Sequence, residues 1–491
     1  MRRFIDMTGK LILRLIKGFN GICMMLIYHF ITICFLQEQF AMKGFSIEIW
    51  HMSFLFLLLY CIFGKIYDAF LVSLVRISEL IYSQMLAFIL SDFILYLVSC
   101  LILNHIVRIH FLLLEIILQL VFSVVWCFLV HHWYFHFYPP KKTMVVYGIS
   151  EGMEDLIQEY GLDIKFDVQK VISSEELRRD LSLIEDYNTI FMSGVESGER
   201  NVILKHSILC RKNMYIIPKI GDVIMRGAKN THLFHLPMMN VTYYNPSPFY
   251  LCAKRCFDIL LSVMALICLS PVFLVTACLI KVTDSGPVFY KQERMTQNGR
   301  KFMIHKFRSM RVDAEKDGIA RLSSGENDDR ITAVGRVIRK LRIDELPQLI
   351  DILKGDLSIV GPRPEREEIA AQYEEVLPEF HLRLQAKAGL TGYAQVYGKY
   401  NSTPYDKLMM DLMYISHPSL LEDLRICFAT LKILFMPEST EGVAAGQTIA
   451  MERNVESLPE TDREDETDAD RENAIEAEEK CDRSEKIGGN P

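Results

Sequence analysis

The sequence predicts a membrane protein built from an N-terminal bundle of transmembrane helices, an α/β middle module and a C-terminal α-rich domain. Three observations predict this fold class: four apolar stretches near the N-terminus, alternating strand-like and helix-like runs after them, and a basic region that begins with one more apolar run. The 491 residues are 50% hydrophobic, which excludes a purely soluble protein of this size. We expect the parts to be residues 1–138, 139–245 and 246–436, followed by a tail, 437–491.

The apolar stretches of the first part are each long enough to cross a bilayer, which takes about 20 helical residues. They cover residues 18–36, 51–70, 84–103 and 111–130. A basic cluster precedes the first of them and is expected to remain cytoplasmic by the positive-inside rule; it comprises Arg2, Arg3, Lys10, Arg14 and Lys17. Four spans return the chain to the cytoplasm, and the aromatic and Pro-Pro segment at 131–142 fits an exit from the bilayer.

The middle module is expected to be Rossmann-like, with a parallel sheet. Strand-type runs at 143–149, 188–192 and 214–217 alternate with helix-type runs at 151–160 and 174–184. The first strand-helix turn lacks the GxGxxG spacing that brings a pyrophosphate to a helix N-terminus, so we favour a structural or regulatory module over a dinucleotide site. The twelve cysteines of the chain form no CxxC pair and are interpreted as reduced, buried thiols rather than metal ligands.

The C-terminal domain opens with an apolar run at 254–281 that Ser270 and Pro271 interrupt near its middle. Proline removes a helix hydrogen bond there, so a break or a sharp kink is expected. Cations flank both ends of the run. A re-entrant helix that enters and leaves by one leaflet satisfies this pattern better than a kinked fifth span, which would place the rest of the chain outside the cell.

Two adjacent carboxylates, Asp344 and Glu345, are the strongest candidates for catalysis. Asp344 is expected to cap a helix of about three turns that has Pro347 in its first turn and ends at Gly355. In an isolated helix the pair would only cap and complement the macrodipole. Arginines at 336, 339 and 342 favour a catalytic role instead, because their positive charge keeps a nearby carboxylate ionised. An ionised carboxylate is a usable nucleophile toward phosphorus, and its neighbour can hold Mg²⁺ or transfer a proton.

Cationic side chains around this pair are candidates for binding phosphates. Lys306 and Arg308 alternate along a predicted strand and can face two oxygens of a diphosphate, although such a pair is more often a solvated face. Arg363 stands between two prolines that fix its backbone, which suits a phosphate clamp, with a rigid turn bearing a surface arginine as the alternative. With Arg339, these residues form the expected substrate-binding set.

The order of these motifs resembles the bacterial sugar transferase family, the monotopic phosphoglycosyl transferases, over residues 251–435. The motifs are KRxxD at 254–258, the Ser270-Pro271 break, SGPVFYKQER at 285–294, KFRSM at 306–310, RIDELPQL at 342–349, LSIVGPRPE at 357–365 and AGLTGYAQVYG at 388–398. The four spans and the α/β module resemble the large form of the family. Ala388 and Tyr393 depart from the proline and tryptophan common in relatives, which bears on sugar specificity.

The resemblance implies an enzyme that passes sugar-1-phosphate from a UDP-sugar to undecaprenyl phosphate, releases UMP and initiates exopolysaccharide, capsule or O-antigen synthesis. It implies that Asp344 attacks the β-phosphorus to form a sugar-phosphoryl aspartate, with Glu345 as the second member of the dyad and Mg²⁺ held by both. It also implies a site on the cytoplasmic face of the bacterial inner membrane and supports re-entrance, because nucleotide sugars are cytoplasmic. The identity of the sugar and a homodimer are left open, and no nucleic-acid partner is expected.

Two other readings remain open at this point. The chain could be a catalytically inert scaffold that recruits polysaccharide-assembly proteins to the lipid bilayer, although the intact motifs argue against an inert domain. It could also act as a glycosyltransferase through the middle module, although 143–240 contains no DxD-like metal pair. The tail at 437–491 holds 17 acidic and 6 basic residues, which predicts disorder and no part in catalysis.

Overall fold

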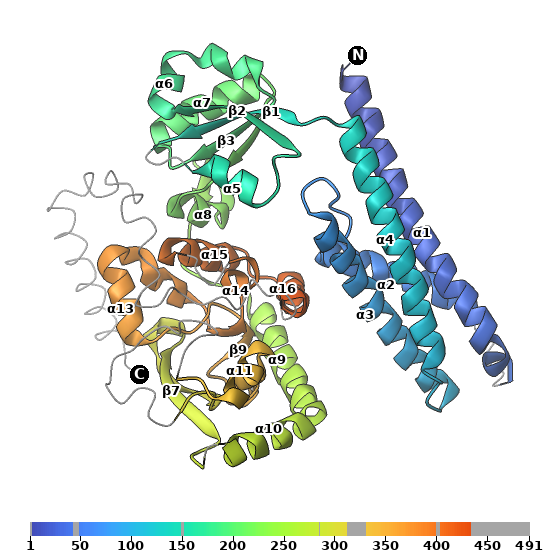
Figure 1. Ribbon diagram of the computed structural model, residues 1–491. Helices are drawn as coiled ribbons and strands as arrows, with labels where there is room; N and C mark the ends of the chain where they lie inside the picture. The colour runs from blue at the N-terminus through green and yellow to red at the C-terminus, as the bar shows by residue number, and fades with distance from the viewer. Residues whose placement is uncertain are drawn as a thin grey trace. The chain divides into compact units, whose positions relative to one another are not determined.

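The computed structural model describes residues 2–42, 49–148, 152–283, 285–311, 330–398 and 403–433. The described chain falls into two compact units: Pro140–Ile217 form one, and the residues before and after that segment form the other (Figure 1). The acidic tail expected at 437–491 lies outside the described residues.

Four long helices form the N-terminal part, as the sequence predicts, and all four are apolar and long enough to cross a membrane. They are α1 (Arg2–Met42), α2 (Ile49–Ile66), α3 (Ile77–Leu103) and α4 (His110–Phe137) (Figure 1). Met24, Phe56 and Phe88 are fully buried between the helices, whereas Leu101 and Leu129 stay exposed on the outside. An apolar outer surface of this kind is suited to lipid, which supports the assignment of this part to the membrane.

The interior of this helical bundle is partly polar. Tyr60 donates a hydrogen bond to Asn20 at 2.8 Å, and Ser123 donates one to Gln84 at 2.7 Å; all four side chains are buried. Hydrogen bonds between helices at membrane depth fix which faces meet, because lipid offers these groups no alternative partner. The bundle is therefore held by specific contacts as well as by apolar packing.

The second unit is an α/β sandwich around a parallel sheet. Its strands are β1 (Lys141–Tyr147), β2 (Phe166–Ser173), β3 (Thr189–Ser193) and β4 (Asn213–Ile216), in the spatial order β2-β1-β3-β4. Its helices are α5 (Met153–Glu159), α6 (Ser174–Arg179), the 3₁₀ helix η1 (Leu181–Asp186) and α7 (Ser197–Leu209). All pairings are parallel, which confirms the predicted sheet. The order is that of flavodoxin-like sheets rather than the Rossmann order 3-2-1-4, so the Rossmann-like assignment is not confirmed.

The second unit ends at Ile217, whereas the sequence reading extends the module to residue 245. The intervening elements are α8 (Ile220–Arg226), β5 (Lys229–Leu233) and β6 (Leu236–Asn240), and they group with the rest of the chain. Gly227, directly after α8, lies so close to Ser416 that a Cβ on it would stand 3.0 Å from the Ser416 carbonyl oxygen. This close approach ties α8 to the C-terminal domain.

The C-terminal domain combines helices with two small two-stranded sheets. Its elements are α9 (Pro248–Cys268), α10 (Ser270–Thr283), β7 (Phe289–Met295), η2 (Gln297–Gly299), β8 (Lys301–Phe307), α11 (Ala333–Lys340), η4 (Ile343–Glu345), α12 (Gln348–Lys354), β9 (Ser358–Val360), α13 (Glu367–Val376), η5 (Pro378–Gln385), β10 (Gly389–Thr391), α14 (Tyr393–Tyr397), α15 (Pro404–Ser416) and α16 (Leu420–Ile433). Strands β7 and β8 are antiparallel, and β9 and β10 are parallel. A core of Ile304, Ile352 and Leu357 joins β8 to α12 and to the residue that precedes β9.

The predicted break in the apolar run is present, because α9 and α10 meet at a bend of 61° (Figure 1). The break falls at Leu269, and the Ser270 hydroxyl donates to the Ile267 carbonyl at 2.8 Å, which satisfies a helix-end acceptor. Pro271 stands in the first turn of α10, where a missing N–H costs little. Ile267 and Leu274 are exposed beside the bend, which leaves an apolar surface on both helices.

The cysteines are free in the described residues, but the expected burial holds only for Cys127. Cys34, Cys61 and Cys256 are exposed because the outward faces of apolar helices carry them. An apolar run in a membrane protein does not imply a protein-buried side chain. The sequence reading of all twelve as buried thiols is wrong for these positions.

Candidate active site

Asp344 and Glu345 lie in the 3₁₀ helix η4, between α11 and α12. Arg342 adopts a left-handed conformation, φ 55°, and turns the chain after α11. Hydrogen bonds of the i→i+3 type follow, from the Glu345 N–H to the Arg342 carbonyl and from the Leu346 N–H to the Ile343 carbonyl. The α-helical ladder therefore begins only at Gln348, and the expectation that Asp344 caps the helix is wrong.

Helix α12 is shorter than the three turns expected, but it ends as predicted. Pro347 occupies its N-cap position, and Gly355 follows its last residue with φ 94°. A glycine adopts this left-handed conformation without the Cβ penalty, which closes the helix. The carboxylate pair is thus placed just before the N-terminus of a buried short helix instead of at its cap.

Glu345 is surrounded by cations. Its carboxylate lies 3.0 Å from Lys306 Nζ, 3.2 Å from Arg363 Nη2 and 3.8 Å from Arg342 Nη1. Burial alone would raise the pKa of Glu345, but the charges of Lys306, Arg363 and Arg342 outweigh it and hold that pKa well below its usual range. Glu345 is therefore a permanent anion that fixes three cationic side chains around one point.

Asp344 has the opposite electrostatic character. Its side chain is buried, and within the described residues its Oδ1 atom has no hydrogen-bond partner. Burial and the neighbouring Glu345 charge raise the pKa of Asp344 to about 6, although Lys306, Arg339 and Arg342 pull it down. The sequence assigned the charges of Arg336, Arg339 and Arg342 to Asp344; Arg339 and Arg342 do act on it, whereas Glu345 is held ionised by Lys306, Arg363 and Arg342. Asp344 is the more basic carboxylate of the pair and is still ionised at neutral pH.

Glu345 lines a solvent-open cavity of ≈ 260 Å³, and the buried Asp344 precedes it directly in the chain. The lining residues are Arg294, Ile304, Lys306, Glu345, Gln348, Arg363, Pro364, Gly389 and Leu390. Three of these side chains are cationic and only one is anionic, so the cavity carries excess positive charge. Such a lining suits a phosphorylated ligand, because Arg and Lys pair with phosphate oxygens.

The loop that carries Arg363 is fixed by contacts beyond its two prolines. Arg383 Nη2 donates to the Arg363 carbonyl at 2.9 Å, and Arg294 Nη1 donates to the Pro364 carbonyl at 3.2 Å. Arg383 also forms a buried ion pair with Asp411 at 2.7 Å. Sequence reasoning missed both arginines as site residues. Arg294 falls within a quoted motif, but no local pattern singles out Arg383.

Charged residues of α9 connect the bent apolar helices to the site. Arg255 donates to the carbonyls of Ile352 and Leu353, at 2.6 and 2.8 Å, and so caps the C-terminus of α12. Asp258 accepts hydrogen bonds from the Ser358 hydroxyl and the Ile359 N–H, at 2.9 and 3.0 Å. The KRxxD motif is thus structural: it ties the apolar helix to the helix and strand that follow the carboxylates.

The other two predicted cations stand further along neighbouring elements. Arg308 directly follows β8; its side chain is buried, and its backbone N–H donates to the Val288 carbonyl at 2.9 Å. Arg339 lies in the last turn of α11 and acts on Asp344 through its charge. The structure therefore brings Lys306 and Arg363 onto Glu345, and substrate contacts of all four predicted cations stay predictions.

The carboxylates fit the Mg²⁺ that the sequence reading assigns to them. The unpartnered Asp344 Oδ1 and the ionised Glu345 offer hard oxygen donors, and Mg²⁺ is commonly bound through one or two carboxylates together with substrate phosphates. Both side chains could hold such an ion.

Comparison with known proteins places the chain in a family. Residues 249–437 match the model of the family described as bacterial sugar transferase. The chain is 40% identical to the exopolysaccharide production protein PSS of Rhizobium leguminosarum bv. phaseoli, over 36% of this chain and 92% of that protein. The chain therefore belongs to the bacterial sugar transferase family, which confirms the resemblance found in its motifs.

Two longer relatives match over about half of their length. The chain is 38% identical to a UDP-N-acetylgalactosamine-undecaprenyl-phosphate N-acetylgalactosaminephosphotransferase of Aeromonas hydrophila, over 48% of this chain and 56% of that protein. It is 35% identical to a UDP-glucose:undecaprenyl-phosphate glucose-1-phosphate transferase of Xanthomonas campestris pv. campestris, over 44% of this chain and 46% of that protein. The first of these relatives is named for N-acetylgalactosamine and the second for glucose.

Proposed function

We propose that this protein transfers sugar-1-phosphate from a UDP-sugar to undecaprenyl phosphate and so begins the synthesis of an exopolysaccharide. The observation that carries the proposal is the buried Asp344 beside Glu345, next to a cavity lined by Lys306 and Arg363. Relatives named for undecaprenyl-phosphate phosphotransfer support the donor and the acceptor.

In the proposed first step, an Asp344 carboxylate oxygen attacks the β-phosphorus of the bound UDP-sugar. A bond from that oxygen to phosphorus forms, the bond from the β-phosphorus to the bridging oxygen breaks, and UMP leaves with the electron pair. The product on the enzyme is a sugar-phosphoryl aspartate. The raised pKa of the free Asp344 carboxyl makes its carboxylate a better nucleophile than that of an ordinary aspartate. The same pKa leaves Asp344 ionised at neutral pH.

In the second step, a phosphate oxygen of undecaprenyl phosphate attacks the same phosphorus and displaces the Asp344 carboxylate. Undecaprenyl-diphosphate-sugar forms, and the aspartate is regenerated. One phosphoanhydride replaces another through an acyl phosphate of comparable reactivity, so the enzyme mainly positions the reactants and neutralises charge.

Glu345 serves to arrange the cations in this proposal. It holds Lys306 and Arg363 at the cavity, where both can reach oxygens of the donor diphosphate. Arg383 and Arg294 fix the backbone on which Arg363 stands, so little ordering entropy is lost when the donor binds. When bound, Mg²⁺ would supply further neutralisation of the diphosphate.

We place the site at the cytoplasmic face of the inner membrane, with α9 and α10 as a re-entrant pair. The 61° bend, the apolar surface beside it and the cations at both ends support this arrangement. Arg255 and Asp258 would then hold the carboxylates beside the bilayer surface, where the phosphate of a polyprenyl acceptor can reach them. A reporter fused after Lys281 should behave as cytoplasmic, and labelling from outside the cell would contradict re-entrance.

The decisive assay uses the purified full-length protein in detergent with undecaprenyl phosphate, Mg²⁺ and a panel of UDP-sugars. We expect UMP release with at least one donor, and a fall of about 10³-fold or more in Asp344→Asn. Glu367→Gln is the control, because Glu367 is an exposed carboxylate on α13 that pairs with the half-exposed Lys301. Absence of UMP release with every donor would favour an inert scaffold over a transferase.

A further inference from the structure

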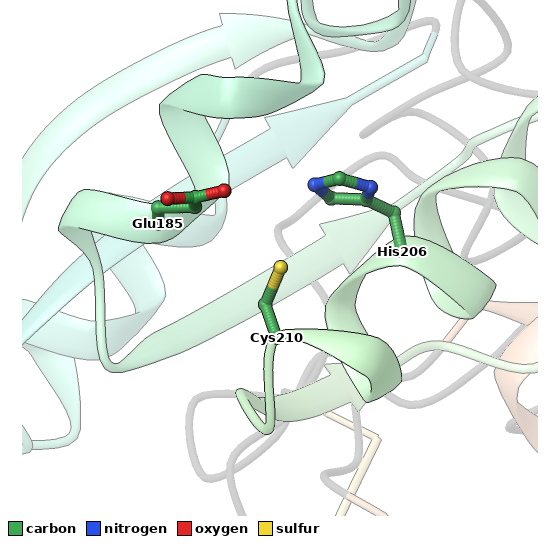
Figure 2. A group of neighbouring side chains, drawn as sticks. All are labelled: Glu185, His206 and Cys210. Carbon is green, nitrogen blue, oxygen red and sulfur yellow. The ribbon is translucent and has the colours of Figure 1, made fainter.

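Three side chains of the α/β unit gather outside the proposed active site: Glu185, His206 and Cys210 (Figure 2). One potential ligand atom from each lies within 4.8 Å of the other two. Figure 2 shows the carboxylate, the imidazole ring and the thiol turned toward a common space. Carboxylate, imidazole and thiolate are the three ligand types found at zinc sites.

The local structure brings these residues together without distortion. His206 lies in the last turn of α7 and Cys210 directly follows that helix, so the spacing of four residues places both on one face. The Cys210 N–H donates to the His206 carbonyl at 2.9 Å, which continues the helical pattern to the thiol. Glu185 comes from η1, where Lys212 Nζ donates to its backbone carbonyl at 2.6 Å and holds that turn in place.

His206 supplies a second and independent observation. Its Nε2 atom is buried, and within the described residues no hydrogen-bond partner faces it. A buried polar nitrogen without a partner costs free energy, and native proteins seldom leave one unexplained. A bound ion would satisfy this atom, because neutral imidazole coordinates metals through either ring nitrogen.

The residues behind the cluster belong to the hydrophobic core of the α/β unit. Ile184, next to Glu185, and Ile203 on α7 are both fully buried in the core of the unit, and Cys210 packs against that core. Zn–S bonds of about 2.3 Å and Zn–N bonds of about 2.0 Å place tetrahedral ligand atoms roughly 3.5 Å apart. Side-chain rotations that move the ligand atoms by about 1 Å would therefore bring them to bonding distance of one ion without moving the backbone.

We propose that Glu185, His206 and Cys210 bind a zinc ion, with a water molecule or an external ligand in the fourth position. The mixed ligand set selects against Mg²⁺, which prefers oxygen donors and octahedral geometry. Binding replaces the thiol proton of Cys210, which is released to solvent, so affinity should rise with pH. This differs from the sequence reading, which treats the cysteines as inert, and it does not depend on the transferase reaction.

The test uses the full-length protein in detergent, freed of metal with a chelator and titrated with Zn²⁺ or Co²⁺. We expect one equivalent of tightly bound zinc and, with Co²⁺, a thiolate-to-cobalt charge-transfer band. Cys210→Ser should abolish that band, and Glu185→Gln should weaken zinc binding about tenfold or more. Because Glu185 is exposed, its substitution leaves the core of the unit intact.

Matched controls separate this site from adventitious binding and from the active site. Cys256→Ser removes an exposed cysteine of α9 and should leave the zinc equivalent and the cobalt band unchanged. Asp344→Asn should also retain both, even though UMP release is lost. Equal zinc binding by the unaltered protein and by Glu185→Gln and Cys210→Ser would overturn the proposal.

Discussion

The carboxylate pair of the C-terminal domain and the Glu185–His206–Cys210 cluster of the α/β unit are two kinds of polar site. At the first, Glu345 lies within 4 Å of three cations, so positive charge is in excess and is held in place by one buried carboxylate. At the second, a buried imidazole nitrogen faces no partner among the described residues. The first site suits a polyanionic ligand, because its cations are already held in place. The second suits a cation, because a metal ion would give the buried imidazole nitrogen a partner.

The largest effect should come from Asp344, because it alone would form the covalent bond. Asp344→Asn keeps the shape of the side chain but removes the nucleophilic charge, and we expect UMP release to fall by about 10³-fold or more. Glu367→Gln should remain within about twofold of the unaltered protein. Comparable turnover by Asp344→Asn would show that Asp344 is not the nucleophile.

The next effect concerns the coupling between the two carboxylates. Since burial and Glu345 raise the pKa of Asp344 to about 6, kcat/KM should fall as the pH drops below about 6 and protonates the nucleophile. Glu345→Gln removes the repulsion and frees Lys306 to act on Asp344, so the acid limb should move to lower pH. We also expect activity at neutral pH to fall about 10²-fold, because the cations lose their anchor. A pH-rate profile measures both effects, and an acid limb that stays in place would contradict the coupling.

A smaller effect tests the support behind Arg363. Arg383→Met leaves Asp411 as a buried charge without its 2.7 Å partner and removes the bond to the Arg363 carbonyl. We expect a loss of roughly 3 kcal/mol in stability, seen by thermal or denaturant unfolding in detergent, together with a higher KM for the donor. The exposed pair of Arg300 and Asp356 is the control, and Arg300→Met should cost less than about 1 kcal/mol. Equal losses in the two variants would refute the role of burial.

The smallest effect belongs to the second site. Zinc at a free concentration 100 times its dissociation constant should stabilise the folded protein by about 2.7 kcal/mol, if the unfolded chain does not bind it. Thermal unfolding with and without zinc measures this shift, and Cys210→Ser should abolish it. The same shift in Cys210→Ser would place the bound zinc elsewhere in the chain.

Features that depend on neighbouring residues could be predicted from the sequence. Apolar length predicted the four helices that are long enough to cross a membrane, and Ser270-Pro271 predicted the bend, because each feature depends on residues adjacent in the chain. Asp344 and Glu345 could be predicted as site residues for a similar reason, because several arginines and Pro347 lie within a few positions of them in the sequence. Local signals therefore identified the part of the active site that one segment supplies.

The remaining features depend on residues distant in sequence. Arg383 supports Arg363 from twenty positions away, and no local pattern marks it. The sequence could not show that the left-handed Arg342 delays α12, or that Lys306 and Arg363 converge on Glu345 rather than on Asp344. The sequence could not show that Glu185, on another element, lies beside Cys210. Tertiary contacts decided each of these points.

If Asp344 becomes covalently phosphorylated by the donor, the sugar-phosphoryl enzyme should accumulate when no acceptor is present. The full-length protein is incubated with the UDP-sugar that supports UMP release, but without undecaprenyl phosphate, then quenched in acid and digested for mass spectrometry. We predict a hexose-phosphate adduct on the peptide containing Asp344, its absence in Asp344→Asn, and its disappearance when undecaprenyl phosphate is added before the quench. An unmodified Asp344 peptide after a stoichiometric burst of UMP, or an adduct on another residue, would contradict the account.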